Sequence, residues 1–475
     1  MSRRGDRGSG YRLRWLALVL VLGVVAASCG DDSDGDDGGA ETGGDATTTT
    51  VVDDAGGEDA SSTSAPPETS AEPEPLPASF RGVTEDTIRV GVAVPDFDAL
   101  QAAGISNYQG DADVAFQAFF DAINADGGVF GRQIDPVYVS FDFVQPETQD
   151  RACAELAEDN EVFIVLYGLL GASNLCLTEI HDTMVMTRSF QTTDLREASG
   201  DTLWLQLNAA DDARTRIMGD VFASSGRLDG RTIGILASSG ENNGLDGQVL
   251  QETLAGYGYD SLLLVTEASG GDPIARDSEF TVLAERFKAE GVDFLFELRG
   301  GGDAVGVFAN AGFTPQYAFK ALGAAVDGAA DRTLLDGALS VSEINEQAMI
   351  DDPQFQSNCL DVVRDANPEL ADEMAFVPSG DEQAAGQPNW VNPVMIACDQ
   401  TMLLDAIGEI AGADLSNDSF RAALDVLGPV DLNGYGRATF DSESKWDGLD
   451  EFFVQQYDAG ADAIDVVGDA VVVDR

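Results

Sequence analysis

His181 is the only histidine in this chain of 475 residues, so any Ser-His-Asp arrangement would have to use it. It falls within a helical pattern at 177–183, away from the strand ends, where a histidine satisfied by its own helix is the simpler interpretation. The sequence contains neither a Gly-x-Ser-x-Gly turn nor a Gly-x-x-x-x-Gly-Lys phosphate loop. Carboxylates are too abundant for any one pair to indicate a catalyst. We therefore expect no enzyme and no cofactor.

The cysteines are the other residues suited to covalent or metal chemistry. Four follow Cys29, and an even number in an exported chain indicates disulfides, for which three pairings are possible. We prefer the pairings in which each partner lies in a neighbouring element, namely Cys153 with Cys176 and Cys359 with Cys398. A zinc site is the alternative, but no Cys-x-x-Cys pair accompanies the single histidine, so we expect no metal.

The first 28 residues read as a signal peptide, because five arginines precede an apolar core at 15–27 that is too short to span a membrane. The core ends in Ala-Ala-Ser-Cys at 26–29, which resembles a bacterial lipobox and implies diacylation of Cys29. An ordinary secretory signal with an incidental cysteine is the alternative. Residues 29–80 are rich in Asp, Gly, Thr, Ser and Pro and poor in apolar side chains, which predicts a disordered acidic linker. The chain is thus expected to be extracytoplasmic and anchored to the membrane.

The formal net charge is −58, from 84 acidic and 26 basic residues. A field of that sign disfavours binding to nucleic acid and adsorption to an anionic membrane surface. The charge bears on solubility and not on activity.

The segment 84–142 has the pattern of one β-loop-α-β unit. Apolar runs at 88–94 and 134–141 flank a helical face at 114–123 and a turn rich in Gly at 124–131. Such units build parallel sheets with helices on both faces, and ligands bind at the carboxyl ends of the strands. The sequence therefore predicts an α/β fold with a functional site in the loops that follow the strands.

The same segment resembles the periplasmic binding proteins of the leucine/isoleucine/valine type. The likeness rests on Thr-Ile-Arg-Val-Gly at 87–91 followed by Ile-Asn-Ala-Asp-Gly-Gly-Val-Phe-Gly-Arg at 123–132. The resemblance implies the type 1 periplasmic-binding-protein fold, in which two lobes of parallel sheet flanked by helices are joined by a hinge. On this basis residues 83–208 and 337–432 form lobe 1, and residues 209–336 and 433–475 form lobe 2. The family also often has a disulfide at the place of Cys153 and Cys176.

The resemblance further implies a cleft in which the first lobe holds the carboxylate of an amino acid and the second lobe holds its ammonium. Carried over by position, the ligand-binding residues are Ser173, Asn174, Phe190, Thr192, Asp211, Leu298, Arg299 and Lys320. The match is poor in the second lobe, where Arg299 and Lys320 stand near the tyrosine and the glutamate of the family. Because basic residues are scarce, we weigh two equal hypotheses: either cation binds a ligand carboxylate, or both pair with acids of the protein.

Together these patterns predict a solute-binding lipoprotein of an ABC importer that delivers a small polar solute, such as an amino acid, amide or carboxylate, to a membrane permease. We expect it to act as a monomer. The alternative is a receptor domain of the same fold that reports ligand occupancy to a signalling system.

Overall fold

The computed structural model describes residues 75–97, 109–142, 145–188, 191–239, 243–267, 272–378 and 387–473. The predicted signal peptide, Cys29 and most of the predicted linker lie outside the described residues, as does Phe190. Among the described residues, none of the helices combines the length and the apolar character that crossing a membrane requires.

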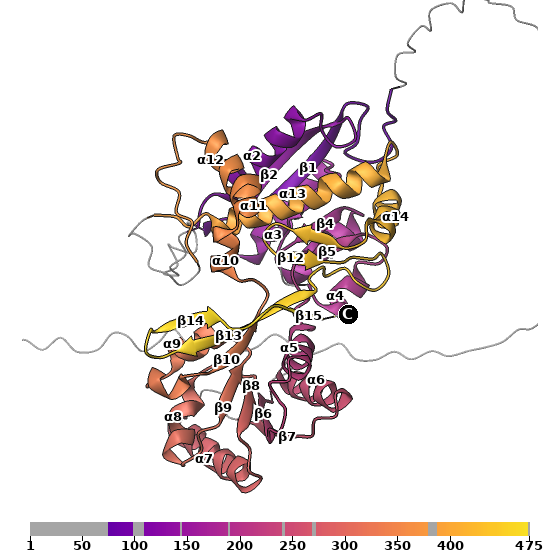
Figure 1. Cartoon of the computed structure of the whole chain (residues 1–475). Coiled ribbons are helices and arrows are strands. Elements are labelled where there is room, and N and C mark those ends of the chain that lie inside the picture. Colours follow the sequence, from indigo (N-terminus) through magenta and orange to yellow (C-terminus); the bar gives the residue numbers. More distant parts are fainter. Residues whose placement is uncertain are drawn as a thin grey trace, which may run out of the picture. The chain divides into compact units, whose positions relative to one another are not determined.

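The first lobe is built on a five-stranded parallel sheet (Figure 1). Its strand order is β2 (Gln133–Phe141), β1 (Thr87–Pro95), β3 (Ile164–Tyr167), β4 (Met184–Thr187) and β5 (Trp204–Gln206). All four residues of β3 and all four of β4 are buried, as expected for parallel strands covered on both faces.

Helices from two distant parts of the chain cover this sheet. The early ones are α2 (Ala112–Ala125), α3 (Pro146–Ala154), η1 (Glu155–Asp159), η2 (Gly171–Ser173), η3 (Cys176–Ile180) and α4 (Thr193–Ala198). The late ones are α10 (Glu346–Asp351), α11 (Pro353–Phe355), η5 (Gln356–Leu360), α12 (Asp361–Ala366), α13 (Val391–Ala411) and α14 (Asn417–Leu427). Figure 1 shows α13 beside α2, and the two helices are in contact.

The second lobe is built on an eight-stranded sheet whose core strands are parallel. The parallel strands are β10 (Leu339–Ser342), β9 (Gln316–Phe319), β8 (Phe294–Glu297), β6 (Ile233–Ser238) and β7 (Ser261–Thr266). Three strands from the end of the chain add to it in antiparallel pairings: β13 (Glu451–Asp458), β14 (Ala463–Val466) and β15 (Val471–Val472). Its helices are α5 (Arg214–Ser224), α6 (Asn243–Gly256), α7 (Pro273–Ala289), α8 (Asp303–Asn310), α9 (Leu322–Gly328) and η4 (Arg332–Leu335).

The two late crossings between the lobes lie at other residues than the predicted boundaries. Strand β10 belongs to the second sheet, so the chain returns to the first lobe after Ser342 and not at 337. The segment 433–449 stays with the first lobe, where β12 (Gly436–Ala438) pairs with β11 (Val430–Leu432) and Asp447 forms a bridge with Gln206. The periodicity of short strands does not reveal which sheet they join, because pairing partners lie far away in sequence.

The turn that carries the family signature serves the structure. Asn124 accepts a 2.6 Å hydrogen bond from the backbone N–H of Ile134 and donates to its carbonyl oxygen. Gly128 has φ 81°, and a Cβ there would lie 2.0 Å from the carbonyl oxygen of Arg132, so only glycine fits. The fully buried Arg132 donates to the carbonyl oxygens of Thr84, Pro77 and Ala413. The motif thus ties β1, β2 and the end of α13 together.

Both preferred cysteine pairs are bonded in the structure. Cys153 and Cys176 link α3 to η3 with a Cα–Cα distance of 6.3 Å, and Cys359 and Cys398 link η5 to α13 with one of 5.5 Å. His181 does not lie in the middle of a helix as expected, because η3 ends at Ile180 and His181 follows it as the C-terminal cap. Its Nε2 lies 3.3 Å from Glu158 Oε1.

Candidate functional site

Two cavities lie at the carboxyl ends of the strands, and they share part of their walls. The smaller has a volume of about 550 Å³ and the larger about 1250 Å³. The smaller cavity takes residues from both lobes: Arg188, Asn208, Asp211, Arg214, Lys320, Glu343, Ile344, Glu346, Asn392, Met395 and Tyr435. Arg214, Lys320 and Glu343 line both cavities.

Arg188 forms the cationic part of the first-lobe wall. It directly follows β4, and its guanidinium is within hydrogen-bonding reach of the phenol oxygens of Tyr167 and Tyr435. Burial acts to lower the pKa of Arg188, but the two phenols outweigh it and the pKa is raised. Burial also raises the pKa of both tyrosines, with Arg188 opposing it, so the phenols stay neutral.

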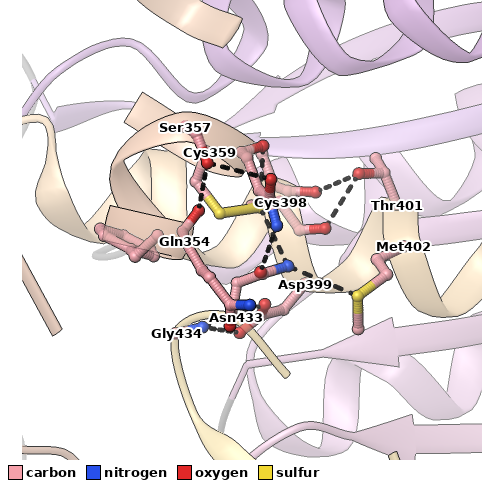
Figure 2. The surroundings of a disulfide bond; sticks show 12 residues. Gln354, Ser357, Cys359, Cys398, Asp399, Thr401, Met402, Asn433 and Gly434 are labelled. Carbon is pink, nitrogen blue, oxygen red and sulfur yellow. Dashed lines mark hydrogen bonds between the residues drawn. A yellow bond between two sulfur atoms is a disulfide. The ribbon is translucent and has the colours of Figure 1, made fainter. Parts of the chain in front are cut away.

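Tyr435 is positioned from behind by Asp399 of α13. The buried Asp399 carboxylate accepts a hydrogen bond from the backbone N–H of Gly434 at 3.0 Å (Figure 2). It accepts a second one from the backbone N–H of Tyr435 at 3.1 Å. Burial raises the pKa of Asp399 to about 7, against the lowering effect of these N–H groups. The Cys359–Cys398 disulfide lies next to this contact, and the Asn433 amide is 3.7 Å from Cys398 Sγ.

Glu343 and its partners form the acidic part of the wall. Glu343 Oε2 accepts a 3.1 Å hydrogen bond from Asn208 Nδ2, and Glu343 Oε1 lies 3.5 Å from Arg214 Nε. Arg214 Nε is also 3.4 Å from Asp211 Oδ1, so two carboxylates share one guanidinium. Burial raises the pKa of Glu343, and Arg214 opposes it. Asn208 Oδ1 is buried and makes no hydrogen bond with any described residue.

The second-lobe cations are each paired with acids of the protein. Arg299, which lines the larger cavity, donates to Glu297 Oε1 at 2.5 Å and to Asp303 Oδ1 at 3.0 Å, and its guanidinium stacks 4.4 Å from the Phe280 ring centroid. Burial raises the pKa of Glu297 to about 7, and Arg299 opposes it. Lys320 Nζ donates to Asp246 Oδ2 at 2.7 Å.

Half of the residues predicted from sequence line a cavity. Asp211 and Lys320 line the smaller one, and Leu298, Arg299 and Lys320 line the larger one. Ser173, Asn174 and Thr192 belong to neither lining. Asn174 is fully buried and bonds the backbone of Leu169 through both ends of its amide, and Thr192 caps α4 by accepting from the N–H of Leu195.

Sequence reasoning missed most of the smaller cavity. Arg188, Asn208 and Glu343 each come one or two residues after a strand, at the ends of β4, β5 and β10. A polar residue directly after a buried strand was therefore a usable signal. Tyr435 and Arg214 gave no such signal, because one precedes a short edge strand and the other begins a helix.

One group of potential metal ligands occurs among the described residues. The ligand atoms of Cys153, Cys176 and His181 lie within 4.8 Å of one another. Both sulfurs are used in the disulfide, so neither is a thiolate that could bind a metal ion.

No family model matches the sequence, and a search of curated proteins found no match. Solved structures do match. An ABC transporter substrate-binding protein from Desulfitobacterium hafniense in complex with Leu is 15% identical, with 80% of this chain and 100% of that chain covered at a TM-score of 0.55. A solute binding protein of an ABC transporter from Rhodopseudomonas palustris BisB5, in complex with 3,4-dihydroxybenzoic acid, is 15% identical. The match covers 82% of this chain and 98% of that chain at a TM-score of 0.51.

A periplasmic binding protein type 1 from Bordetella pertussis Tohama I is 16% identical, with 81% of this chain and 100% of that chain covered at a TM-score of 0.50. At such low identity these likenesses establish the architecture. With one parallel sheet, one mixed sheet and three crossings between them, the protein has the two-lobed fold of the type 1 periplasmic binding proteins, the fold of ABC transporter substrate-binding proteins.

Proposed function

We propose that this protein is the extracytoplasmic solute-binding lipoprotein of an ABC importer, and that it holds a small polar solute in the smaller cavity without altering it. The observation that carries the proposal is the composition of that cavity, in which Arg188, Asn208 and Tyr435 of the first lobe face the same space as Lys320 of the second. Its volume of about 550 Å³ suits a small molecule.

The polar groups of the cavity support an amino acid, an amide or a carboxylate as the solute. Asn208 Oδ1 is a buried acceptor that a donor group of a ligand would satisfy, because burial without a partner is costly. Two of the structural neighbours were solved with leucine and with 3,4-dihydroxybenzoic acid, both of which are small carboxylic acids.

We propose Asp211 and Lys320 as ligand-binding residues of the smaller cavity, and Leu298 and Arg299 as residues of the larger space that a longer solute would reach. Ligand contacts by Ser173, Asn174, Phe190 and Thr192 stay predictions, which a structure with bound solute tests directly.

The test is a thermal-shift screen of the purified full chain against amino acids, aromatic acids, ureas and the matched amides, followed by calorimetry. A solute that binds only the native state raises the melting temperature, by mass action. Asn208→Ala should weaken binding of the best solute, whereas Asn310→Ala, at the exposed end of α8, should not. A screen in which no solute binds, or in which both variants bind equally well, would contradict the proposal.

The lipid anchor and the permease are tested in cells. Cys29 should incorporate an alkyne fatty acid, and Cys29→Ser should abolish the label and release the protein from the membrane. Deletion of the gene should lower uptake of the solute found in the screen. Normal uptake combined with loss of a signalling response would favour the receptor alternative instead.

A further inference from the structure

Arg188 differs from the other two cations that line the smaller cavity. Arg214 is shared by Asp211 and Glu343, and Lys320 pairs with Asp246. Across the residues that the structure describes, Arg188 forms no ion pair, and its guanidinium is met by the phenols of Tyr167 and Tyr435. Arg188 is partly buried and has no carboxylate partner among the described residues, although the protein has a net charge of −58 and acids are abundant.

Helix α13 anchors the backbone around Arg188 at three points. Consecutive residues of this helix, Asp399 and Gln400, accept the backbone N–H groups of Tyr435 and Tyr167, at 3.1 Å and 2.8 Å. Gln400 Nε2 also donates to the carbonyl oxygen of Met186, two residues before Arg188, at 3.2 Å. Both helix residues are fully buried. The backbone of both tyrosines and of the strand end that carries Arg188 is therefore anchored without any solute, and we call Arg188, Tyr167 and Tyr435 the arginine corner.

The chemistry of this corner selects an anion. A guanidinium has five N–H donors in a rigid fork, and two neutral phenol oxygens do not exhaust them. The fork matches the two oxygens of a carboxylate, and such charge-assisted bonds are short and strong where water is excluded. A neutral amide of the same shape offers one acceptor oxygen and places an NH₂ group against the cation.

We infer that Arg188 receives the carboxylate of the bound solute, so that the solutes taken by the smaller cavity are small organic carboxylates. This inference rests on the solute-binding role proposed above and narrows it. It assigns to Arg188 of the first lobe the carboxylate contact that one of the two sequence hypotheses gave to Arg299 or Lys320, both of which are paired with acids.

The experiment compares carboxylates with their amides on the purified full chain: L-leucine with L-leucinamide, and 3,4-dihydroxybenzoate with 3,4-dihydroxybenzamide, extended to whichever acids the screen finds. Calorimetry at constant pH and salt should show the acid binding about 10- to 100-fold more tightly than its amide, as expected for one charge-assisted bidentate contact. This comparison needs no variant, so it does not depend on whether a variant folds.

Arg188→Gln should then weaken binding of the acid much more than binding of the amide, so the ratio of the two affinities falls toward one. Arg188→Lys keeps the charge but not the fork and should give an intermediate ratio. The control Arg89→Gln changes a half-buried arginine of β1 that pairs with Asp135 and lines neither cavity, so it should keep the wild-type ratio.

The outcomes separate the two proposals. A solute that binds equally well as acid and amide, or a ratio that survives Arg188→Gln, overturns the inference and leaves the solute-binding role in place. A protein that binds no solute at all overturns the solute-binding role and the inference with it.

Discussion

Asp399 in the middle of α13 accepts a 3.1 Å hydrogen bond from the backbone N–H of Tyr435, and thereby joins the buried core of the first lobe to the wall of the smaller cavity. The same carboxylate oxygen accepts the N–H of Gly434 at 3.0 Å. A side chain outside the cavity lining thus sets the position of one that belongs to it.

Asp399→Ala should lower both stability and affinity, because it leaves the buried N–H groups of Gly434 and Tyr435 without an acceptor. We expect a loss of about 1–3 kcal/mol in the free energy of unfolding, measured in urea. We also expect weaker binding of the solute that binds best in the thermal-shift screen. Asp405→Ala is the control in the same helix. The charged neighbours of the Asp405 carboxylate are the acids Glu409 and Asp126, so its removal should leave no N–H group without an acceptor. Equal effects from the two variants would contradict the anchoring role.

Gly434→Ala should disturb the same contact between Asp399 and the turn at 433–435 by steric overlap. A Cβ at Gly434 would lie 2.1 Å from Met395 Cγ and 2.9 Å from Asp399 Oδ2, so the cavity-lining Met395 must move. Gly306→Ala in α8 is the matched control, since its Cβ would meet nothing within 4 Å and helix propensity favours alanine by up to about 1 kcal/mol. We expect weaker solute binding only for Gly434→Ala, and unchanged affinity would show that Met395 yields without consequence.

The two disulfides should differ in their effect on binding more than in their effect on stability. They span 39 and 23 residues, and these loop lengths differ by about 0.5 kcal/mol in closure entropy, so removing either pair should cost a similar amount, about 3–4 kcal/mol. Only Cys359–Cys398 adjoins Asp399 and the turn at Asn433. The double serine variant of that pair should weaken solute binding more than the variant of Cys153–Cys176, as calorimetry on both would show. Equal losses of affinity would remove the special role of the late disulfide.

Stability should fall as the pH rises toward neutrality, partly because of Glu297. Burial raises its pKa to about 7 in the folded protein, from an ordinary value of 4.5, so between these values the native state binds more protons than the unfolded state. Unfolding then releases protons, and the free energy of unfolding decreases with pH by at most about 1.4 kcal/mol per unit for this group. Glu297→Gln should flatten urea-unfolding profiles between pH 4.5 and 7, whereas parallel profiles for variant and wild type would contradict the assignment.

The fold was largely accessible from sequence because its strands are buried runs separated by clear turns. The unit from β1 to β2, the strands β3 to β9 and the long helix α13 all produce strong local patterns. The crossings were not accessible, because β10 and the segment before β13 are short and their sheet is chosen by partners far along the chain.

The site was less accessible than the fold, and the reason is specific. Position alone led to Asp211 and Lys320, which do line the smaller cavity. It could not show that Asn174 folds back on Leu169, or that Arg299 is already paired with Glu297. It also could not find Tyr435, because the position of Tyr435 depends on Asp399 of α13, and helix α14 and strand β11 lie between them in the sequence.

The bridge between Gln206 and the segment at 446–448 bears on how the polypeptide acquires its structure after synthesis. The N–H of Gln206 donates to the carbonyl oxygen of Trp446 at 2.8 Å, and its own carbonyl oxygen accepts from Gly448 at 2.9 Å. The edge of the first-lobe sheet is therefore completed by residues that follow Gln206 only after most of the second lobe, so this pairing closes a long loop and should form late in folding.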